Sequence, residues 1–172
     1  MDQKFPYIPI TKGRKVAGWC GPAAIHNVVH RLGIEVSEEE VAKVMGTTPE
    51  AGTSHEGMLA ACKYLGLEAE WRKFPATMEA FDELEEITKK GNLIILDWMS
   101  GPNEIEDGHY SEFFGIMPQG GEKAVILGDP EWVGSIRIIR AKDFLRVWYD
   151  TSVDQNGKIT KYLENFALII HK

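Results

Sequence analysis

The sequence predicts a single α+β domain over residues 1–172, because helical and strand patterns are segregated along the chain. The first half shows apolar residues at three- and four-residue spacings, which are typical of amphipathic helices. The second half shows short apolar runs between turn residues, which are typical of strands. No internal repeat and no convincing linker interrupts the 172 residues, whose 44% hydrophobic content suffices for a core without a disulfide.

Four helices are expected in the first half, and their starts are marked by capping signals. The first is expected over residues 20–32. The second and third begin at the capping boxes of residues 37–40 and 53–56, and the fourth begins after residue 77. Glycines that follow the first and third helices provide C-terminal stops. Cys62 falls on the apolar stripe of the third helix, so we expect it in the core. His55 lies in the second capping box and is expected to be an exposed first-turn residue.

The second half is expected to form strands joined by short turns. They are predicted over residues 93–98, 109–117, 123–128, 135–140 and 166–171, with a short helix over 141–149. The sequence Pro-Gln-Gly-Gly at residues 118–121 predicts the turn between the second and third of these strands. Residues 100–108 contain Gly, Pro and Asn and predict a loop.

Composition excludes several classes of function. A net charge of −7 argues against a nucleic-acid partner, which needs clustered basic residues. No apolar run approaches the length of a membrane span, and no signal core follows the first residues, so we expect no membrane partner and a cytoplasmic location. Two cysteines do not make a disulfide scaffold, so both thiols are expected to be reduced. No cofactor is expected.

Cys20 is the candidate nucleophile. It begins the first predicted helix, where the helix dipole places partial positive charge. A thiolate is stabilised at such a position, and the thiolate is the reactive form of cysteine. A small buried cysteine is the alternative interpretation of the same position.

Of the five histidines, His109 is the best candidate for a general base. It follows Asp107-Gly108 at the start of a predicted strand, and antiparallel pairing about the 118–121 turn brings Asp129 to within about two residues of the position opposite it. A carboxylate there can fix the tautomer of the imidazole. Asp97 and Asp107 compete with Asp129 for this role.

Two further histidines suggest a metal site only weakly. His26 and His30 are four residues apart, but the Glu of the usual zinc motif is replaced by Asn27, and no further ligand pair is evident. No metal is therefore expected.

Three motifs in this order resemble those of the bacteriocin-processing, double-glycine-leader cysteine peptidases. They are Gly-Trp-Cys-Gly-Pro-Ala-Ala at residues 18–24, Asp-Gly-His-Tyr at 107–110 and Gly-Asp-Pro at 128–130, within a resemblance that covers roughly residues 5–150. The resemblance implies a papain-like fold, in which a helical half packs on a mainly antiparallel sheet. It implies Cys20 as nucleophile, His109 as general base and acid, and Asp129 as the group that orients His109. Trp19, beside the nucleophile, could line a substrate groove or simply be packed, and Gly108 and Tyr110, which flank His109, are further candidate substrate contacts.

The chain departs from the family pattern at two positions. Arg14 stands six residues before Cys20, where the family usually has a Gln that helps to bind the oxyanion. Arg14 could donate through its guanidinium, or it could be a surface charge. Glu112 interrupts a strand that is usually apolar, and it is expected on the face opposite His109.

These observations favour a cysteine hydrolase that cleaves a peptide or isopeptide bond through a Cys-His-Asp triad and a thioester. The expected partner is a peptide or protein substrate. An acyl transferase with the same triad, similar to transglutaminases, is one alternative. A peptide-binding module that lacks useful catalysis, because the oxyanion Gln is missing, is the other.

Overall fold

The computed structural model describes residues 13–14, 16–131 and 134–172. Its elements are, in order, α1 (Cys20–Arg31), α2 (Glu38–Met45), α3 (His55–Tyr64), β1 (Glu68–Lys73), α4 (Glu79–Lys89), β2 (Leu93–Met99), β3 (Gly108–Gln119), β4 (Glu122–Asp129), β5 (Ser135–Arg140), α5 (Ala141–Val147), β6 (Tyr149–Val153), β7 (Ile159–Glu164) and β8 (Phe166–His171). The expectation of an α+β fold with a mainly antiparallel sheet is confirmed.

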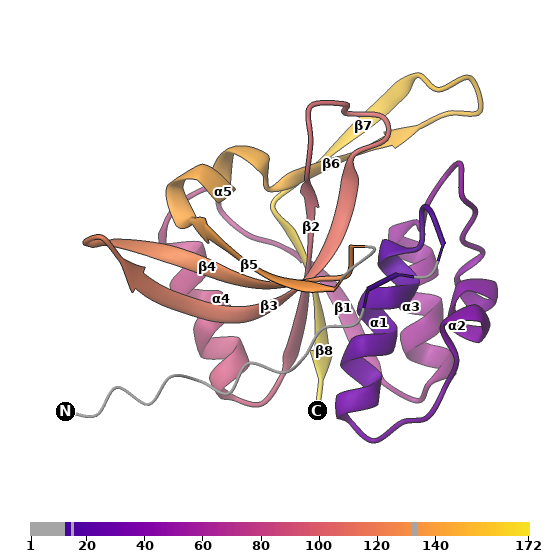
Figure 1. Cartoon of the computed structure of the whole chain (residues 1–172), viewed down its shortest axis with the longest axis horizontal. Helices are drawn as coiled ribbons and strands as arrows, with labels where there is room; N and C mark the ends of the chain where they lie inside the picture. Colours follow the sequence, from indigo (N-terminus) through magenta and orange to yellow (C-terminus); the bar gives the residue numbers. More distant parts are fainter. Residues whose placement is uncertain (1–12, 15, 132–133) are drawn as a thin grey trace.

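A six-stranded antiparallel sheet forms the centre, in the order β1-β8-β2-β3-β4-β5. Helices α1–α3 gather on one side of it, whereas α4 and α5 lie toward the other (Figure 1). Strands β6 and β7 form a separate two-stranded ribbon that projects from the body. The sheet therefore separates two cores.

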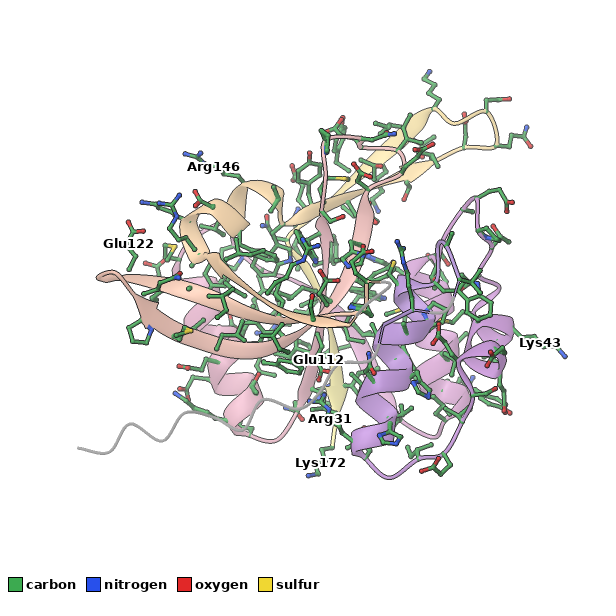
Figure 2. All side chains as sticks on the ribbon, in the orientation of Figure 1. Arg31, Lys43, Glu112, Glu122, Arg146 and Lys172 are labelled. Carbon is green, nitrogen blue, oxygen red and sulfur yellow. The ribbon has the colours of Figure 1, made fainter. Side chains whose placement is uncertain are left out.

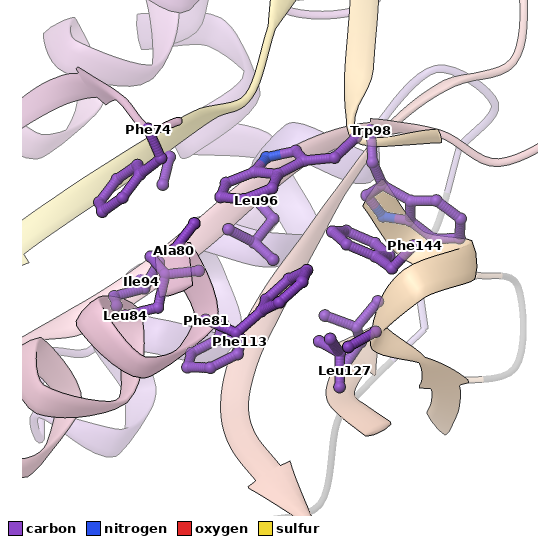
Figure 3. Packing of buried hydrophobic residues seen from close by; sticks show 14 of the residues in the cluster. Phe74, Ala80, Phe81, Leu84, Ile94, Leu96, Trp98, Phe113, Leu127 and Phe144 are labelled. Atoms are coloured by element: carbon purple, nitrogen blue, oxygen red, sulfur yellow. The ribbon is translucent and has the colours of Figure 1, made fainter. Parts of the chain in front are cut away.

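Alternation along β2 divides the apolar side chains between these cores. Ile95 packs with the residues of α1–α3, whereas Leu96 and Trp98 pack with those of α4 and α5. The second core is rich in aromatic rings, among them Trp98 and Phe144 with centroids 5.5 Å apart (Figure 3). Each such buried side chain contributes about 1.5–3 kcal/mol, so the strand that carries Trp98 is firmly held.

A buried ion pair joins the first helix to the sheet. Arg31 in the last turn of α1 pairs with Glu112 of β3, which is almost fully buried (Figure 2). Burial of a charge is costly without such a partner. Glu112 thus lies on the α1 side of the sheet, one residue out of step with Ser111, which bonds Trp98 on the other side.

Capping explains the starts of two helices and corrects one prediction. Ser37 accepts a hydrogen bond from the Glu40 amide at the start of α2, as expected. At α3 the N-cap is Ser54, which accepts from Gly57, and not Thr53. Thr53 is buried instead, with its hydroxyl 2.6 Å from that of Thr47.

Three strands were not predicted from the sequence. β1 pairs with β8 at the sheet edge, and β6 pairs with β7, and both regions carry exposed polar residues that obscure the strand pattern. The predicted turn at residues 118–121 is shorter than expected. Strand β3 continues to Gln119, and Gly120 and Gly121 with φ of +58° and +82° form the two-residue turn.

Candidate active site

The turn before α1 places Cys20 at the first position of the helix. Gly18 adopts a φ of +75°, and a Cβ at this residue would lie 2.9 Å from the carbonyl oxygens of Thr48 and Pro49. Glycine is required there on both grounds. Cys20 is 5% exposed, and its backbone N–H belongs to the first turn, where helices leave amide groups without intrahelical partners.

The β3–β4 hairpin brings His109 and Asp129 together. Phe113 pairs with Leu127, and continuing that register toward the start of β3 sets Asp129 two residues from the position opposite His109. The Nε2 atom of His109 lies 2.5 Å from Oδ1 of Asp129, and both side chains are buried. Because Nε2 is taken by the carboxylate, Nδ1 is the nitrogen available to Cys20.

Arg137 is a site residue that sequence reasoning missed. Its guanidinium pairs with Oδ2 of Asp129, so the two carboxylate oxygens have separate partners. It also lies 5.7 Å from the ring centroid of Trp98, which in turn contacts the edge of His109. The only sequence signal was its position in the strand that follows the Gly-Asp-Pro motif, and a second arginine, Arg140, lies in the same strand.

Electrostatics favour a charged Cys20–His109 pair. Burial raises the pKa of the Cys20 thiol, but the hydrogen bond and positive charge of His109 lower it. A hydrogen bond from the Tyr110 backbone amide and the charge of Arg14 act in the same direction as His109, so the pKa of Cys20 is lowered overall. Burial lowers the pKa of His109, but the bonds to Asp129 and Cys20 raise it to about 10. Cys62 behaves differently, since burial raises its pKa to about 11. It lies in the core, as expected.

Arg14 lies beside the nucleophile. Its backbone amide donates to the carbonyls of Pro130 and Glu131 at 3.1 and 3.2 Å. Its Nη2 atom lies 3.0 Å from Glu131 Oε2, while the other oxygen of Glu131 lies 3.8 Å from His109 Nδ1. Glu131 was not predicted, and it ties the segment before α1 to the end of β4.

The candidate substrate contacts occupy different environments. Trp19 is the half-buried N-cap residue of α1. Tyr110 is 4% exposed, and its hydroxyl donates to the Thr53 carbonyl at 2.8 Å, which gives this side chain a packing role. Gly108 contacts the Asp150 carboxyl group so closely that a Cβ would lie 2.1 Å from its Oδ1 atom.

The two competing aspartates do not reach His109. Asp107 lies in the loop before β3, where its Oδ2 accepts from the Asn103 amide. Asp97 points to the other side of the sheet, and its Oδ2 lies 2.6 Å from Nε2 of His55. The expectation that His55 is exposed was wrong, because this contact and stacking on Trp71 bury its side chain to 14% exposure.

Two groups of side chains contain residue types that can bind a metal ion. His26 and His30 have ring centroids 6.2 Å apart, and no group of three possible ligands among the described residues includes them. His109, Asp129 and Glu131 do have ligand atoms within 4.8 Å of one another. These atoms already pair with one another and with the guanidinium groups of Arg14 and Arg137, whose positive charges repel a metal ion. The arrangement therefore suits proton transfer better than metal binding.

Residues 2–155 match the Peptidase_C39 like family. The chain belongs to this family. Its fold is similar to that of the peptidase domain of Streptococcus ComA, described as a bifunctional ABC transporter involved in quorum sensing, with a TM-score of 0.65 and 19% identity over 94% of this chain and 96% of that one. A double-glycine-motif protease from an AMS/PCAT transporter, solved with its leader peptide, gives a TM-score of 0.64 and 17% identity over 98% and 94%.

Two uncharacterized archaeal proteins match a shorter part of the sequence. They come from Methanothermobacter thermautotrophicus, with 42% identity over 50 residues, and Methanothermobacter marburgensis, with 40% over 57 residues. These matches cover 29% and 33% of this chain and span about a third of each relative, at 34% and 39% of its length. Within the described part of the chain, each helix is too short or too polar to cross a membrane.

Proposed function

We propose that this member of the family is a cysteine peptidase in which Cys20 is the nucleophile, His109 the general acid and base, and Asp129 the group that orients His109. The observation that carries the proposal is the buried chain of contacts from Cys20 through His109 to Asp129, with opposite pKa shifts at the thiol and the imidazole. Such shifts favour a thiolate–imidazolium pair, which is the reactive form in thiol peptidases.

The reaction follows from these charges. The Cys20 thiolate attacks the carbonyl carbon of the scissile bond, and the imidazolium of His109 gives its proton to the leaving amine as the C–N bond breaks. A thioester remains on Cys20. His109, now neutral, takes a proton from water, whose oxygen attacks the thioester and releases the carboxylic acid and the thiolate. Asp129 keeps the Nε2–H tautomer, which leaves Nδ1 for both transfers.

Two groups of this chain can stabilise the oxyanion. The Cys20 backbone N–H stands at the start of α1, and Arg14 carries a positive charge close enough to lower the thiol pKa. We assign Arg14 the role that a Gln has in the resembled peptidases, with Glu131 holding its guanidinium. One such donor is worth about 10²–10³ in rate.

The substrate we propose is a peptide segment with small residues at the scissile bond. One structural neighbour is described as a double-glycine-motif protease bound to its leader peptide, which supports this choice. Synthetic peptides with an internal Gly-Gly are therefore the first substrates to test.

The test combines thiol titration with cleavage. Alkylation of Cys20 is followed by mass spectrometry from pH 4 to 10, with Cys62 as internal reference. We expect Cys20 in the wild type to react with an apparent pKa below 9.0, and this advantage to vanish in His109→Ala. We further expect the wild type to cleave Gly-Gly peptides, and Cys20→Ala to leave them intact. A Cys20 that titrates like a free thiol contradicts the proposal, and amine-dependent products would indicate acyl transfer instead.

A further inference from the structure

A second buried polar cluster lies on the α1–α3 side of the sheet. It consists of His55 at the start of α3, Asp97 of β2 and Asp150 of β6. Asp97 is fully buried, and its carboxyl group lies within hydrogen-bonding range of that of Asp150. The proposed mechanism uses none of these residues.

The hydrogen bonds of the cluster require a proton between the two carboxyl groups. Asp97 Oδ2 accepts from Nε2 of His55 at 2.6 Å, but no N–H group or hydroxyl among the described residues reaches Asp97 Oδ1. Two carboxylates cannot hydrogen-bond each other. A proton on Asp150 donated to Asp97 Oδ1 supplies the missing donor, and Asp150 Oδ1 is left to accept from the Thr151 amide at 2.7 Å.

We infer that Asp97 and Asp150 are a positioning pair that shares one proton at neutral pH and so limits the negative charge that the pair itself places in range of Cys20 to a single unit. The pair's protonation is expected because Asp97 Oδ1 is buried without a donor beside a second carboxyl group, and only its link to the Cys20 thiolate rests on the proposed function. Like charges in contact cannot both ionise readily. Consistently, burial raises the pKa of Asp97 and of Asp150 to about 8, and the Cys20 charge acts in the same direction on Asp97.

Other charged groups around the pair do not remove the need for this proton. Burial lowers the pKa of His55 to about 4, so the imidazole is neutral at pH 7 and donates through Nε2. The remaining titratable or charged groups in range are Cys20 of α1, Glu56 of α3, His109 and Tyr110 of β3, and Lys161 of β7.

The pair sits directly against the backbone of the candidate site. Gly108 precedes His109 and packs on the Asp150 carboxyl group. Asp97 on β2 pairs with Tyr110 on β3, and the backbone N–H of Tyr110 donates a hydrogen bond to the Cys20 thiolate. A second negative charge at the pair would therefore act on the thiolate through a few intervening atoms, within buried surroundings where charges interact strongly.

The proton gives the fold a defined pH dependence. Both folded pKa values lie above the ordinary 3.8, and the one proton that the pair shares is the extra proton that the folded state binds between about pH 4 and 8. Stability is then greatest below that window and declines as pH rises through it. One extra proton raises the unfolding equilibrium constant by up to tenfold per pH unit.

The experiment measures urea unfolding from pH 4 to 9 for the wild type, Asp150→Asn and Asp97→Asn. Either amide supplies its own N–H donor and needs no extra proton. We expect the ratio of unfolding constants, wild type over variant, to rise by up to tenfold per pH unit until about pH 8 for both variants. Glu164→Gln, an exposed carboxyl on the same ribbon, is the matched control and should give a flat ratio. A flat ratio for both Asn variants overturns the inference.

The link to Cys20 is tested by repeating the measurement in Cys20→Ser. Removing the thiolate should let the pair lose its proton more easily, so the ratio of Cys20→Ser over Cys20→Ser/Asp150→Asn should level off at a lower pH than in the wild-type background. If the ratio levels off at the same pH in both backgrounds, the link between the pair and Cys20 is overturned. If Cys20 in the wild type titrates like a free thiol, the proposed function is contradicted. The ratio of unfolding constants, wild type over Asp150→Asn, would still rise with pH in that case.

Discussion

The molecule contains two buried His–Asp pairs with nearly the same contact and opposite charge states. His109 lies 2.5 Å from Asp129, and His55 lies 2.6 Å from Asp97. Yet the pKa of His109 is raised to about 10, whereas burial lowers that of His55 to about 4. Distance to a carboxyl group alone therefore does not make a histidine basic.

The two pairs also differ in what surrounds the second oxygen of each carboxyl group. Arg137 pairs with the other oxygen of Asp129, and the Cys20 side chain hydrogen-bonds His109. In the other pair, the free oxygen of Asp97 meets the carboxyl group of Asp150. A cation at that position stabilises an ion pair, whereas a second acid brings a shared proton.

The largest expected effect separates the two histidines by activity. His109→Ala should reduce kcat/KM on a Gly-Gly peptide by about 10⁴-fold, because it removes both proton transfers. His55→Gln keeps an N–H donor toward Asp97 and should change kcat/KM less than tenfold. Steady-state cleavage assays measure both. Similar losses in the two variants would show that the pairs act as one unit.

Gly108→Ala should disturb the position where the two pairs meet. Its Cβ would lie 2.1 Å from Asp150 Oδ1, and such overpacking costs about 1–3 kcal/mol. Urea unfolding measures the loss. The double variant Gly108→Ala/Asp150→Ala removes the clashing oxygen, so the alanine at 108 should cost less in that background. An equal cost in both backgrounds would place the strain elsewhere.

Arg137→Met should move the first pair toward the behaviour of the second. Without the guanidinium, Asp129 supports the imidazolium less well, so the pKa of His109 falls and that of Cys20 rises. A rise of one pKa unit at Cys20 would slow its alkylation at pH 6 by about tenfold. Arg140→Met on the same strand removes a guanidinium that pairs with Asp143 and serves as control. Equal rates of Cys20 alkylation in Arg137→Met and Arg140→Met would show that Arg137 has no role in the site.

The smallest expected effect is the pH dependence of stability that Cys20 contributes. The raised His109 pKa gives stability that is full below 6.5 and lost as pH rises through about 10. The lowered Cys20 pKa gives stability present above 9.0 and lost as pH falls through its folded value. Together they make the wild-type advantage over Cys20→Ser rise as pH passes through the folded pKa of Cys20, level off once the His109 effect opposes it, and decline between about pH 9 and 10. Unfolding curves across this range test it, and a steady slope would contradict it.

The first pair could be predicted from the sequence because its partners are joined by one hairpin. The Gly-Gly turn fixed the β3–β4 register closely enough to place Asp129 near His109. The second pair could not, because His55, Asp97 and Asp150 come from three elements separated by long stretches of chain. The polar ribbon that carries Asp150 also lacks a clear strand pattern, so even its backbone was assigned to no element.

Arg137 and Glu131 show a second limit. Both lie near predicted site residues in the sequence, but their contacts depend on how β5 crosses the end of β4 and how residue 14 attaches there. A charged residue beside a motif is usually solvated, so its type alone gave no reason to select it. The replacement of the family's Gln by Arg14 is explained by the structure, in which Glu131 pairs with the Arg14 guanidinium.

The order of the sheet also determines when it can form during synthesis. Strand β8 lies between β1 and β2, although it follows both of them in the chain. Until residues 166–171 have emerged from the ribosome, the facing edges of β1 and β2 lack the strand that pairs with both. The nascent chain therefore carries two unpaired strand edges until its last strand is made, and such edges are prone to wrong pairing.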